Sequence, residues 1–148
     1  MGTFNAMSAR SLQYYLMAKH WASDLEFFKV ETSFFKHLID RYFTKVAEFS
    51  GVENLRKIMQ KIQCLQDDEL LLREALAKQI RQLELMADDF VPENIDRLKG
   101  KQIELEGLIA NLLEEFRQVK KELFTLIETV MREDEHHIWP IKTIRHLN

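Results

Sequence analysis

Apolar side chains recur at regular intervals through the first third of the chain. Every seventh position in one register is aromatic: Tyr14, Trp21, Phe28, Phe35, Tyr42 and Phe49. Small or branched residues stand four positions after these aromatic residues: Ala18, Leu25, Thr32, Ile39 and Val46. Alternating spacings of three and four residues are the heptad pattern of packed helices, with apolar residues at positions a and d. The pattern predicts one long helix whose aromatic ladder forms part of a core.

Two later stretches repeat this spacing, so the chain carries three apolar seams. The second seam is formed by Leu55, Ile58, Ile62, Leu65, Glu69, Leu72, Leu76, Gln79, Leu83, Met86 and Phe90. The third seam is formed by Ile95, Leu98, Gln102, Leu105, Ile109, Leu112, Phe116, Val119, Leu123, Leu126 and Val130. A period of about 3.5 residues sustained over such lengths predicts helices wound in a left-handed supercoil.

Glycine and proline mark the boundaries of these stretches. Gly51 is part of a turn signal, Pro92 suits the first turn of a helix, and Pro140 stops the last stretch. The sequence therefore predicts a flexible N-terminus over residues 1–10, helices over 11–49, 53–89 and 92–137, and a tail over 138–148.

Short connections make consecutive helices antiparallel neighbours. We therefore expect an all-α fold, an antiparallel bundle of three long helices packed through heptad seams, as a single domain over residues 11–137. Aligned in this way, the seams pair small with large side chains, as with Ala18 and Met86. The apolar tail, 138–148, is expected to form a short strap on the bundle or to pack on a partner.

Polar residues interrupt the apolar seams at Glu69, Gln79 and Gln102. Burying a polar group without a partner costs about 1 to 3 kcal/mol, so each of these side chains needs a hydrogen-bond partner. Gln102 falls in the same layer as Trp21, whose indole N–H is a donor. This placement predicts a hydrogen bond between the two side chains.

Glu69 leaves several alternatives open. Its carboxylate can reach the rim of the bundle, pair with Lys36 or Arg73, or stay protonated with a raised pKa. A single polar residue in a seam commonly fixes the register of the helices. The functional alternative is a proton-relay or metal-binding carboxylate.

Composition narrows the class of protein. The chain has 148 residues, of which 46% are hydrophobic and 30% are charged, as in a soluble globular domain. Its net charge of −3 includes no block of Lys and Arg, which argues against a nucleic-acid partner or an anionic membrane surface. No stretch approaches the roughly 18 apolar residues of a membrane span, and the N-terminus lacks a signal-peptide pattern. Because the single cysteine, Cys64, forms no disulfide within the chain, we expect a cytoplasmic protein.

Motifs for catalysis are absent from the sequence. It has no Gly-rich phosphate loop, nucleophile elbow or zinc-knuckle spacing, so we expect neither an enzyme nor a bound cofactor. One cluster has metal-binding chemistry, since Glu133, His136 and His137 combine carboxylate with imidazole, which suit zinc or iron. Histidines at a helix C-terminus also interact favourably with the helix dipole, which is a structural explanation for the same cluster.

Further apolar residues lie beside the seams, at positions that a three-helix core leaves outside. This second apolar stripe comprises Met17, Phe27, Phe34, Leu38, Leu71, Leu85, Ile103, Leu113, Phe124, Ile127 and Met131. The interface is expected at Phe27, Phe34, Leu38, Leu113, Phe124, Ile127 and Met131, together with Trp139 of the tail. Because contiguous apolar surface commonly marks an interaction site, we expect a structural or interaction protein that forms a homodimer or recruits a protein partner. The alternatives are a metal-binding bundle that uses the Glu133 cluster, and a small-molecule binder that opens its aromatic core around Trp21, Phe28 and Phe35.

Overall fold

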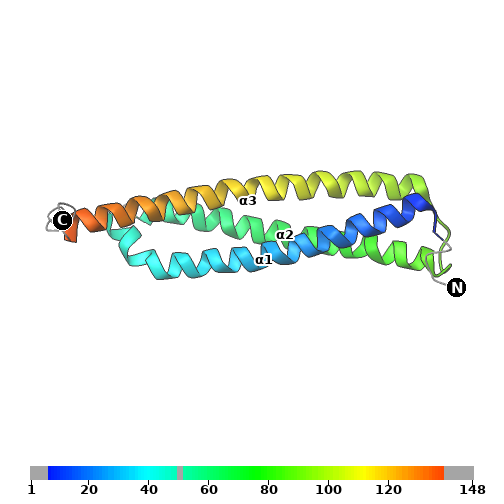
Figure 1. The fold of residues 1–148 in the computed structure, drawn as a ribbon, viewed down its shortest axis with the longest axis horizontal. Helices are drawn as coiled ribbons and strands as arrows, with labels where there is room; N and C mark the ends of the chain where they lie inside the picture. Colours follow the sequence, from blue (N-terminus) through cyan, green and yellow to red (C-terminus); the bar gives the residue numbers. More distant parts are fainter. Residues whose placement is uncertain (1–6, 50–51, 139–148) are drawn as a thin grey trace, which may run out of the picture. The chain divides into compact units, whose positions relative to one another are not determined.

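The computed structural model describes residues 7–49 and 52–138, and their side chains as far as Glu135. It contains helices α1 (Ala9–Phe49), α2 (Val52–Ala87) and α3 (Ile95–Ile138), which pack against one another in pairs (Figure 1). The described residues form no strand. The predicted all-α bundle of three long helices is therefore confirmed. The strap was predicted over residues 138–148; Ile138 is the last residue of α3, and residues 139–148 lie outside the described part of the chain.

The helices contribute to two compact units. Unit 1 combines Met1–Val30 with Gln66–Glu114, and unit 2 combines Glu31–Leu65 with Glu115–Asn148, each as far as the structure describes them. Each unit therefore contains part of every helix and has its own buried apolar side chains.

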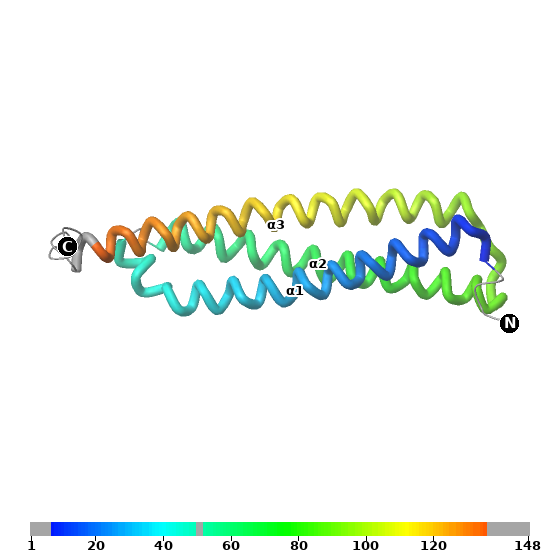
Figure 2. Tube along the Cα trace, in the orientation of Figure 1, coloured from blue at the N-terminus to red at the C-terminus, as the bar shows by residue number. Residues whose placement is uncertain are grey.

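Within each unit, α1 and α3 run in the same direction and α2 runs against them (Figure 2). In unit 2, Glu31 of α1 pairs with Lys120 of α3, and Lys45 of α1 pairs with Asp134 of α3. Both pairs span the same sequence separation, 89 residues. The constant separation means that these parts of α1 and α3 advance together in parallel, residue for residue.

Residues of the heptad seams fill the interior of each unit. In unit 1, Ala18, Leu25 and Leu83 are at most 1% exposed. In unit 2, Phe35 is fully buried, and its ring stacks on Phe116 with centroids 5.2 Å apart. The other members of the aromatic ladder are Phe28, which is buried, and Tyr14, Trp21, Tyr42 and Phe49, which are partly exposed. The handedness of any supercoil stays a prediction.

Helix α2 ends at Ala87, two residues earlier than the sequence pattern predicts. The amide of Asp89 donates to the carbonyl of Met86, and the amide of Phe90 donates to the carbonyl of Leu85. With the positive φ of 61° at Asp89, these bonds form a Schellman C-cap. The side chain of Phe90 is consequently 75% exposed. The prediction that Phe90 completes the second seam is wrong, because the chain leaves the helix before that position.

Helix α3 begins at Ile95, three residues later than predicted. The side chain of Asn94 accepts a hydrogen bond of 3.1 Å from the amide of Arg97 and so caps the helix. Pro92 lies in the loop before this cap rather than in the first helical turn. The proline predicts that the helix begins at residue 92, whereas the side-chain acceptor of Asn94 determines where α3 begins.

Helix α1 begins at Ala9, and its first turn is tied to the loop before α3. Ser8 Oγ accepts a hydrogen bond from the amide of Ser11 at 3.1 Å, as an N-cap does. Glu93 accepts hydrogen bonds from the Ser8 amide at 3.3 Å and from the Ser11 hydroxyl at 2.7 Å. These bonds from Ser8 and Ser11 lower the pKa of Glu93. We call Ser8, Ser11 and Glu93 the N-cap clasp. Because α1 begins at Ala9, the helix includes the last two residues of the segment predicted as a flexible N-terminus, 1–10.

Candidate interaction surface

Unit 2 carries an apolar surface on the flank where α1 and α3 run in parallel. We call it the α1–α3 face, and it consists of Phe34, Leu38, Phe124, Ile127 and Met131. Phe34 is 52% exposed and Phe124 is 41% exposed, while the other three side chains are half-buried. All five belong to the second apolar stripe, at heptad positions c and g of α1 and b and e of α3. Because these positions adjoin the a and d seam on one side of each helix, they gather on a common flank.

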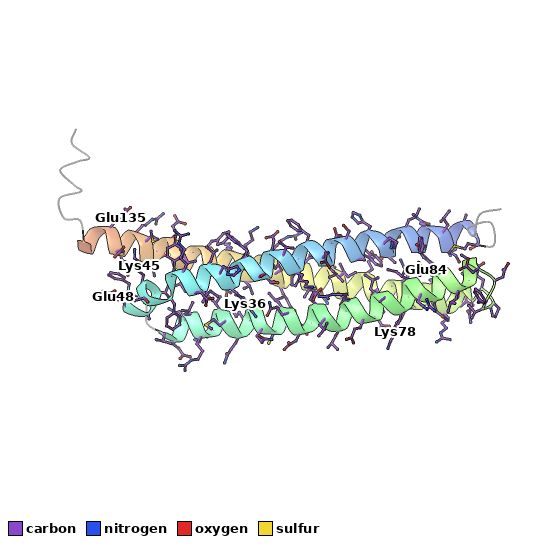
Figure 3. All side chains as sticks on the ribbon, turned by 90° about the horizontal axis from the view of Figure 1, so that it is seen from below. Lys36, Lys45, Glu48, Lys78, Glu84 and Glu135 are labelled. Carbon is purple, nitrogen blue, oxygen red and sulfur yellow. The ribbon has the colours of Figure 1, made fainter. Side chains whose placement is uncertain are left out.

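Ion pairs bracket the α1–α3 face along the helices. Glu31 Oε2 lies 3.4 Å from Lys120 Nζ, and Lys45 Nζ lies 2.9 Å from Asp134 Oδ2. Figure 3 labels Lys45 on the last turns of α1, beside the end of α3 that carries Glu135. The hydrogen bond to Asp134 raises the pKa of Lys45. The two pairs have opposite polarity, since α1 supplies the acid in the first and the base in the second.

Leu38 and Ile127 lie midway between these ion pairs. Leu38 is seven residues from each α1 member of the pairs, and Ile127 is seven residues from each α3 member. Ile127 also follows Leu38 by 89 residues, the separation that both ion pairs have. The midpoint between the two ion pairs therefore lies between Leu38 and Ile127, and each ion pair is about 10.5 Å from that midpoint along the helices.

Phe124 connects the α1–α3 face to the interior of unit 2. Its ring meets the buried ring of Phe35 edge-on, with centroids 5.9 Å apart. Lys120 Nζ lies 5.9 Å from the centroid of the Phe124 ring, within cation–π range. An aromatic side chain that is held by the core and still partly exposed is well suited to contact a partner, since little conformational entropy remains to be lost.

The flank between α2 and α3 of unit 2 is polar. It contains a recess of about 570 Å³ whose lining residues are polar except for Ile58 and Leu126. The ion pair between Lys61 and Glu122, at 2.8 Å, is part of this lining. The lining of this recess therefore contains two apolar side chains, compared with the five of the α1–α3 face.

The flank between α1 and α2 of unit 2 carries exposed apolar residues that the sequence analysis missed. Phe43 and Val52 are each 42% exposed, and Met59 is 45% exposed. The heptad register assigns all three to position e, so the sequence did contain a signal for them. Their exposure is similar to that of Phe34 and Phe124, so this α1–α2 flank provides a matched control for the α1–α3 face.

The other residues predicted as an interface do not belong to unit 2 as described. Phe27 and Leu113 are part of unit 1, where Phe27 is 65% exposed and Leu113 is half-buried. Trp139 lies outside the described residues. The α1–α3 face therefore contains five of the eight residues predicted as an interface.

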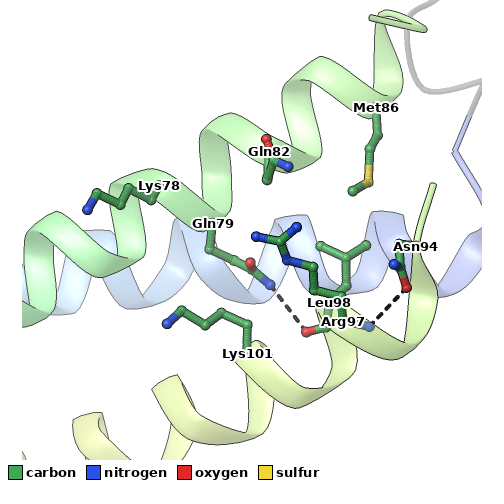
Figure 4. Close-up of a pocket in the computed structure, with 8 residues that line it drawn as sticks. All are labelled: Lys78, Gln79, Gln82, Met86, Asn94, Arg97, Leu98 and Lys101. Atoms are coloured by element: carbon green, nitrogen blue, oxygen red, sulfur yellow. Dashed lines mark hydrogen bonds between the residues drawn. The ribbon is translucent and has the colours of Figure 1, made fainter. Parts of the chain in front are cut away.

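Unit 1 contains a basic recess of about 320 Å³ between α2 and α3 (Figure 4). The cations in its lining are Lys78, Arg97 and Lys101. Its amide side chains serve the fold, because Gln79 Nε2 donates to the carbonyl of Leu98 and Asn94 caps α3. Long cationic side chains lose conformational entropy when they order around an anion, and we assign no ligand to this recess.

The buried glutamines of unit 1 are hydrogen-bonded to one another. Gln79 Nε2 donates to Gln102 Oε1 at 3.2 Å, and Gln102 Nε2 donates to the backbone carbonyl of Tyr14 at 3.2 Å. The predicted hydrogen bond between Gln102 and Trp21 is wrong, because the acceptor Gln102 Oε1 receives the Gln79 amide instead. The network connects all three helices of unit 1 and leaves its buried polar atoms satisfied.

Glu69 is 4% exposed and pairs with Arg73, one turn later on α2. Arg73 Nη2 donates to both carboxylate oxygens at 2.6 Å, and Arg73 Nε donates to Oε1 at 2.9 Å. The hydrogen bonds to Glu69 raise the pKa of Arg73. Of the alternatives for Glu69, the structure therefore has the ion pair with Arg73.

The predicted metal cluster lies at the end of α3. Glu133 is exposed, and the side chains of His136 and His137 fall outside the described part of the structure. The neighbouring carboxylate, Asp134, is turned toward α1, where it pairs with Lys45. Among the side chains that the structure describes, no group of three His, Cys, Asp or Glu residues is placed to hold a metal ion. The Glu133 cluster stays a prediction.

The small-molecule alternative was placed at Trp21, Phe28 and Phe35. Neither recess described above is lined by Trp21, Phe28 or Phe35. Phe35 is instead packed between aromatic neighbours on α3. The free thiol of Cys64 is exposed on α2.

Comparisons with known proteins leave the family of this chain open. No protein-family model matches it, and searches of curated proteins and of solved structures found no significant similarity. None of the helices, as far as they are described, is long and apolar enough to cross a membrane. The α1–α3 face is therefore the feature from which a function can be argued.

Proposed function

We propose that this chain is a non-enzymatic interaction protein that forms a homodimer through the α1–α3 face. The observation that supports the proposal is the exposure of Phe34 and Phe124 on one flank, together with three half-buried apolar neighbours. Monomeric proteins rarely leave a large contiguous apolar surface uncovered. Aromatic side chains in such surfaces commonly contribute much of the binding free energy.

A second copy of the chain is the partner to which the proposal commits. Most soluble oligomers are homo-oligomers, and two-fold dimers are the commonest of them. Two identical flanks made of parallel helices can bury their apolar residues against each other by helix packing. The resulting dimer would act as a scaffold. We place it in the cytoplasm, which the exposed thiol of Cys64 supports because reducing compartments preserve free thiols.

The test compares two exposed phenylalanines of α1 that lie on different flanks. We expect Phe34→Ser to convert the dimer to a monomer at concentrations where the wild-type protein is dimeric, since it removes an apolar contact of the α1–α3 face. Phe43→Ser, on the α1–α2 flank, should keep the dimer mass. Light scattering measures the mass, and far-ultraviolet circular dichroism checks that helicity is unchanged in both variants.

Two results would contradict the proposal. A wild-type protein that stays monomeric over a dilution series up to about millimolar concentration does not self-associate to any useful degree. The second is a dimer that dissociates in the Phe43→Ser variant but not in the Phe34→Ser variant. Its interface would lie on the α1–α2 flank.

A further inference from the structure

The charges around the α1–α3 face follow an order that an antiparallel copy of the same face complements. On α1 an acid, Glu31, and a base, Lys45, lie seven residues to either side of Leu38. On α3 the order is reversed, with Lys120 before Ile127 and Asp134 after it. A half-turn about an axis perpendicular to the helices, at the midpoint between the two ion pairs, exchanges the two ends of each helix. Each charged side chain of one copy then faces a side chain of opposite charge on the other copy.

We propose that the homodimer is antiparallel, with its two-fold axis perpendicular to the helices at the midpoint between the two ion pairs, near Leu38 and Ile127. This inference rests on the proposed homodimer and specifies its geometry. Helix α1 packs against the partner's α1, and α3 packs against the partner's α3. Glu31 then lies beside the partner's Lys45.

The same symmetry acts on α3, where Lys120 lies beside the partner's Asp134. Because the operation is two-fold, each of these contacts occurs twice. The four charged side chains are accessible to a partner to different degrees: Lys45 and Lys120 are 44% and 42% exposed, and Glu31 and Asp134 are 22% and 12% exposed. The bases can therefore reach across the interface while they keep their contacts within the chain.

Two-fold symmetry also allows a dimer whose axis is parallel to the helices. In that arrangement α1 would lie against the partner's α3 in the same direction, and residues at one level would face each other. Helix dipoles favour the antiparallel form, because four parallel helix segments would align their positive ends on one side. Both forms bury the apolar centre of the face, so the helix dipoles decide between them.

Charge reversals that preserve each ion pair within the chain test this geometry. Lys45→Glu combined with Asp134→Lys keeps an acid opposite a base between α1 and α3. Across the antiparallel interface, however, the new glutamate faces the partner's Glu31 and the new lysine faces the partner's Lys120. We expect the dimer dissociation constant, measured by sedimentation equilibrium, to rise at least about tenfold.

The reciprocal variant and a matched control complete the set. Glu31→Lys combined with Lys120→Glu should weaken the dimer in the same way, and combining all four substitutions should restore the dissociation constant to within about threefold of the wild-type value. The control reverses the α2–α3 ion pair, with Lys61→Glu and Glu122→Lys. It should leave the dimer unchanged, because this pair lies on the polar flank.

Each result has one meaning. Weakening in both double variants and recovery in the fourfold variant supports the antiparallel dimer. A stable dimer that neither double variant weakens overturns the inference but not the proposed function. In a parallel dimer, opposite charges face each other in the wild type, in both double variants and in the fourfold variant. A protein that is monomeric in every form overturns both.

Cross-linking provides a measurement that does not depend on charge. With Cys64→Ser to remove the native thiol, Leu38→Cys places a cysteine beside its own copy at the proposed axis. Oxidation should give a disulfide-linked dimer. Lys57→Cys in the same background, on the α2–α3 flank, should not. An unlinked Leu38→Cys protein that is nevertheless dimeric would show that the axis lies elsewhere.

Discussion

Asp89 adopts a left-handed backbone conformation in the cap that ends α2, with φ at 61°. For a residue with a Cβ atom this conformation costs roughly 1 kcal/mol or more of conformational free energy, whereas glycine adopts it freely. Aspartate tolerates it better than most residues because its side chain is short and polar. The Asp89 side chain is exposed, so the cap needs its backbone but no packing contact from it.

We expect Asp89→Gly to raise the free energy of unfolding by about 0.5 kcal/mol, the relief of backbone strain less the greater freedom of glycine in the unfolded chain. Urea denaturation would measure the change. The control is Asp88→Gly, one residue earlier, where φ is not positive and glycine should bring no gain. An equal gain at both positions would mean that the removed negative charge, and not the backbone, is responsible.

The N-cap clasp shows how the ends of two helices stabilise each other. The first turn of α1 leaves amides without partners inside the helix, and Ser8 and Glu93 accept hydrogen bonds from two of them. In a capping box the second acceptor comes from the third residue of the same helix. Here that residue is Ser11, and Glu93 from the loop before α3 takes its place. The start of α1 therefore depends on the loop between α2 and α3.

The stability of unit 1 should depend on the ionisation of Glu93. Its pKa is lowered in the folded protein by hydrogen bonds from Ser8 and Ser11, so this contribution is fully present above the ordinary value of 4.5 and disappears as pH falls through the folded value. Glu93→Gln should unfold at lower urea than the wild type at pH 7, by about 0.5 kcal/mol or less, because the site is exposed and screened. At a pH below the folded pKa of Glu93 the two proteins should converge in stability. A difference that persists unchanged into acid would contradict this role of the carboxylate.

The sequence predicts the elements of this protein better than their ends. Heptad spacing alone located all three helices, because burial of the a and d positions is repeated along each of them. The ends depend on single caps, such as Asn94 and the left-handed Asp89, which compete with the obvious signal of Pro92. Gln102 was assigned the wrong partner, since its acceptor receives the Gln79 amide; its own amide donates to the carbonyl of Tyr14, a kind of acceptor that is present at every residue and carries no sequence signal.

The proposed homodimer predicts a dependence of stability on protein concentration. If only the folded chain dimerises, mass action stabilises it as protein concentration rises. Over a hundredfold concentration range this contributes about 1.4 kcal/mol per chain, which for a chain of this size raises Tm by about 3 to 5 °C. Scanning calorimetry would measure the shift. Phe34→Ser should abolish the concentration dependence, and a wild-type Tm that is independent of concentration would contradict self-association.

The α1–α3 face could be predicted in part. Its residues occupy heptad positions that adjoin the seam, so the sequence identified Phe34, Leu38 and Ile127 as neighbours of the core. What the pattern did not contain is the ion pairing between α1 and α3. Asp134, which pairs with Lys45, is next to Glu133, for which the sequence suggests a different role.

The constant separation of 89 residues between paired positions of α1 and α3 also determines how unit 2 responds to a pulling force. A load that slides one helix along the other must separate both ion pairs and the stacked rings of Phe35 and Phe116 at once. The apolar seams would fit again only after a slip of one heptad, about 10.5 Å, and a slip of two heptads would set Lys45 beside Lys120. Because smaller slips would leave the seams mismatched, unit 2 should resist sliding of α1 along α3 and transmit a pulling force with little extension.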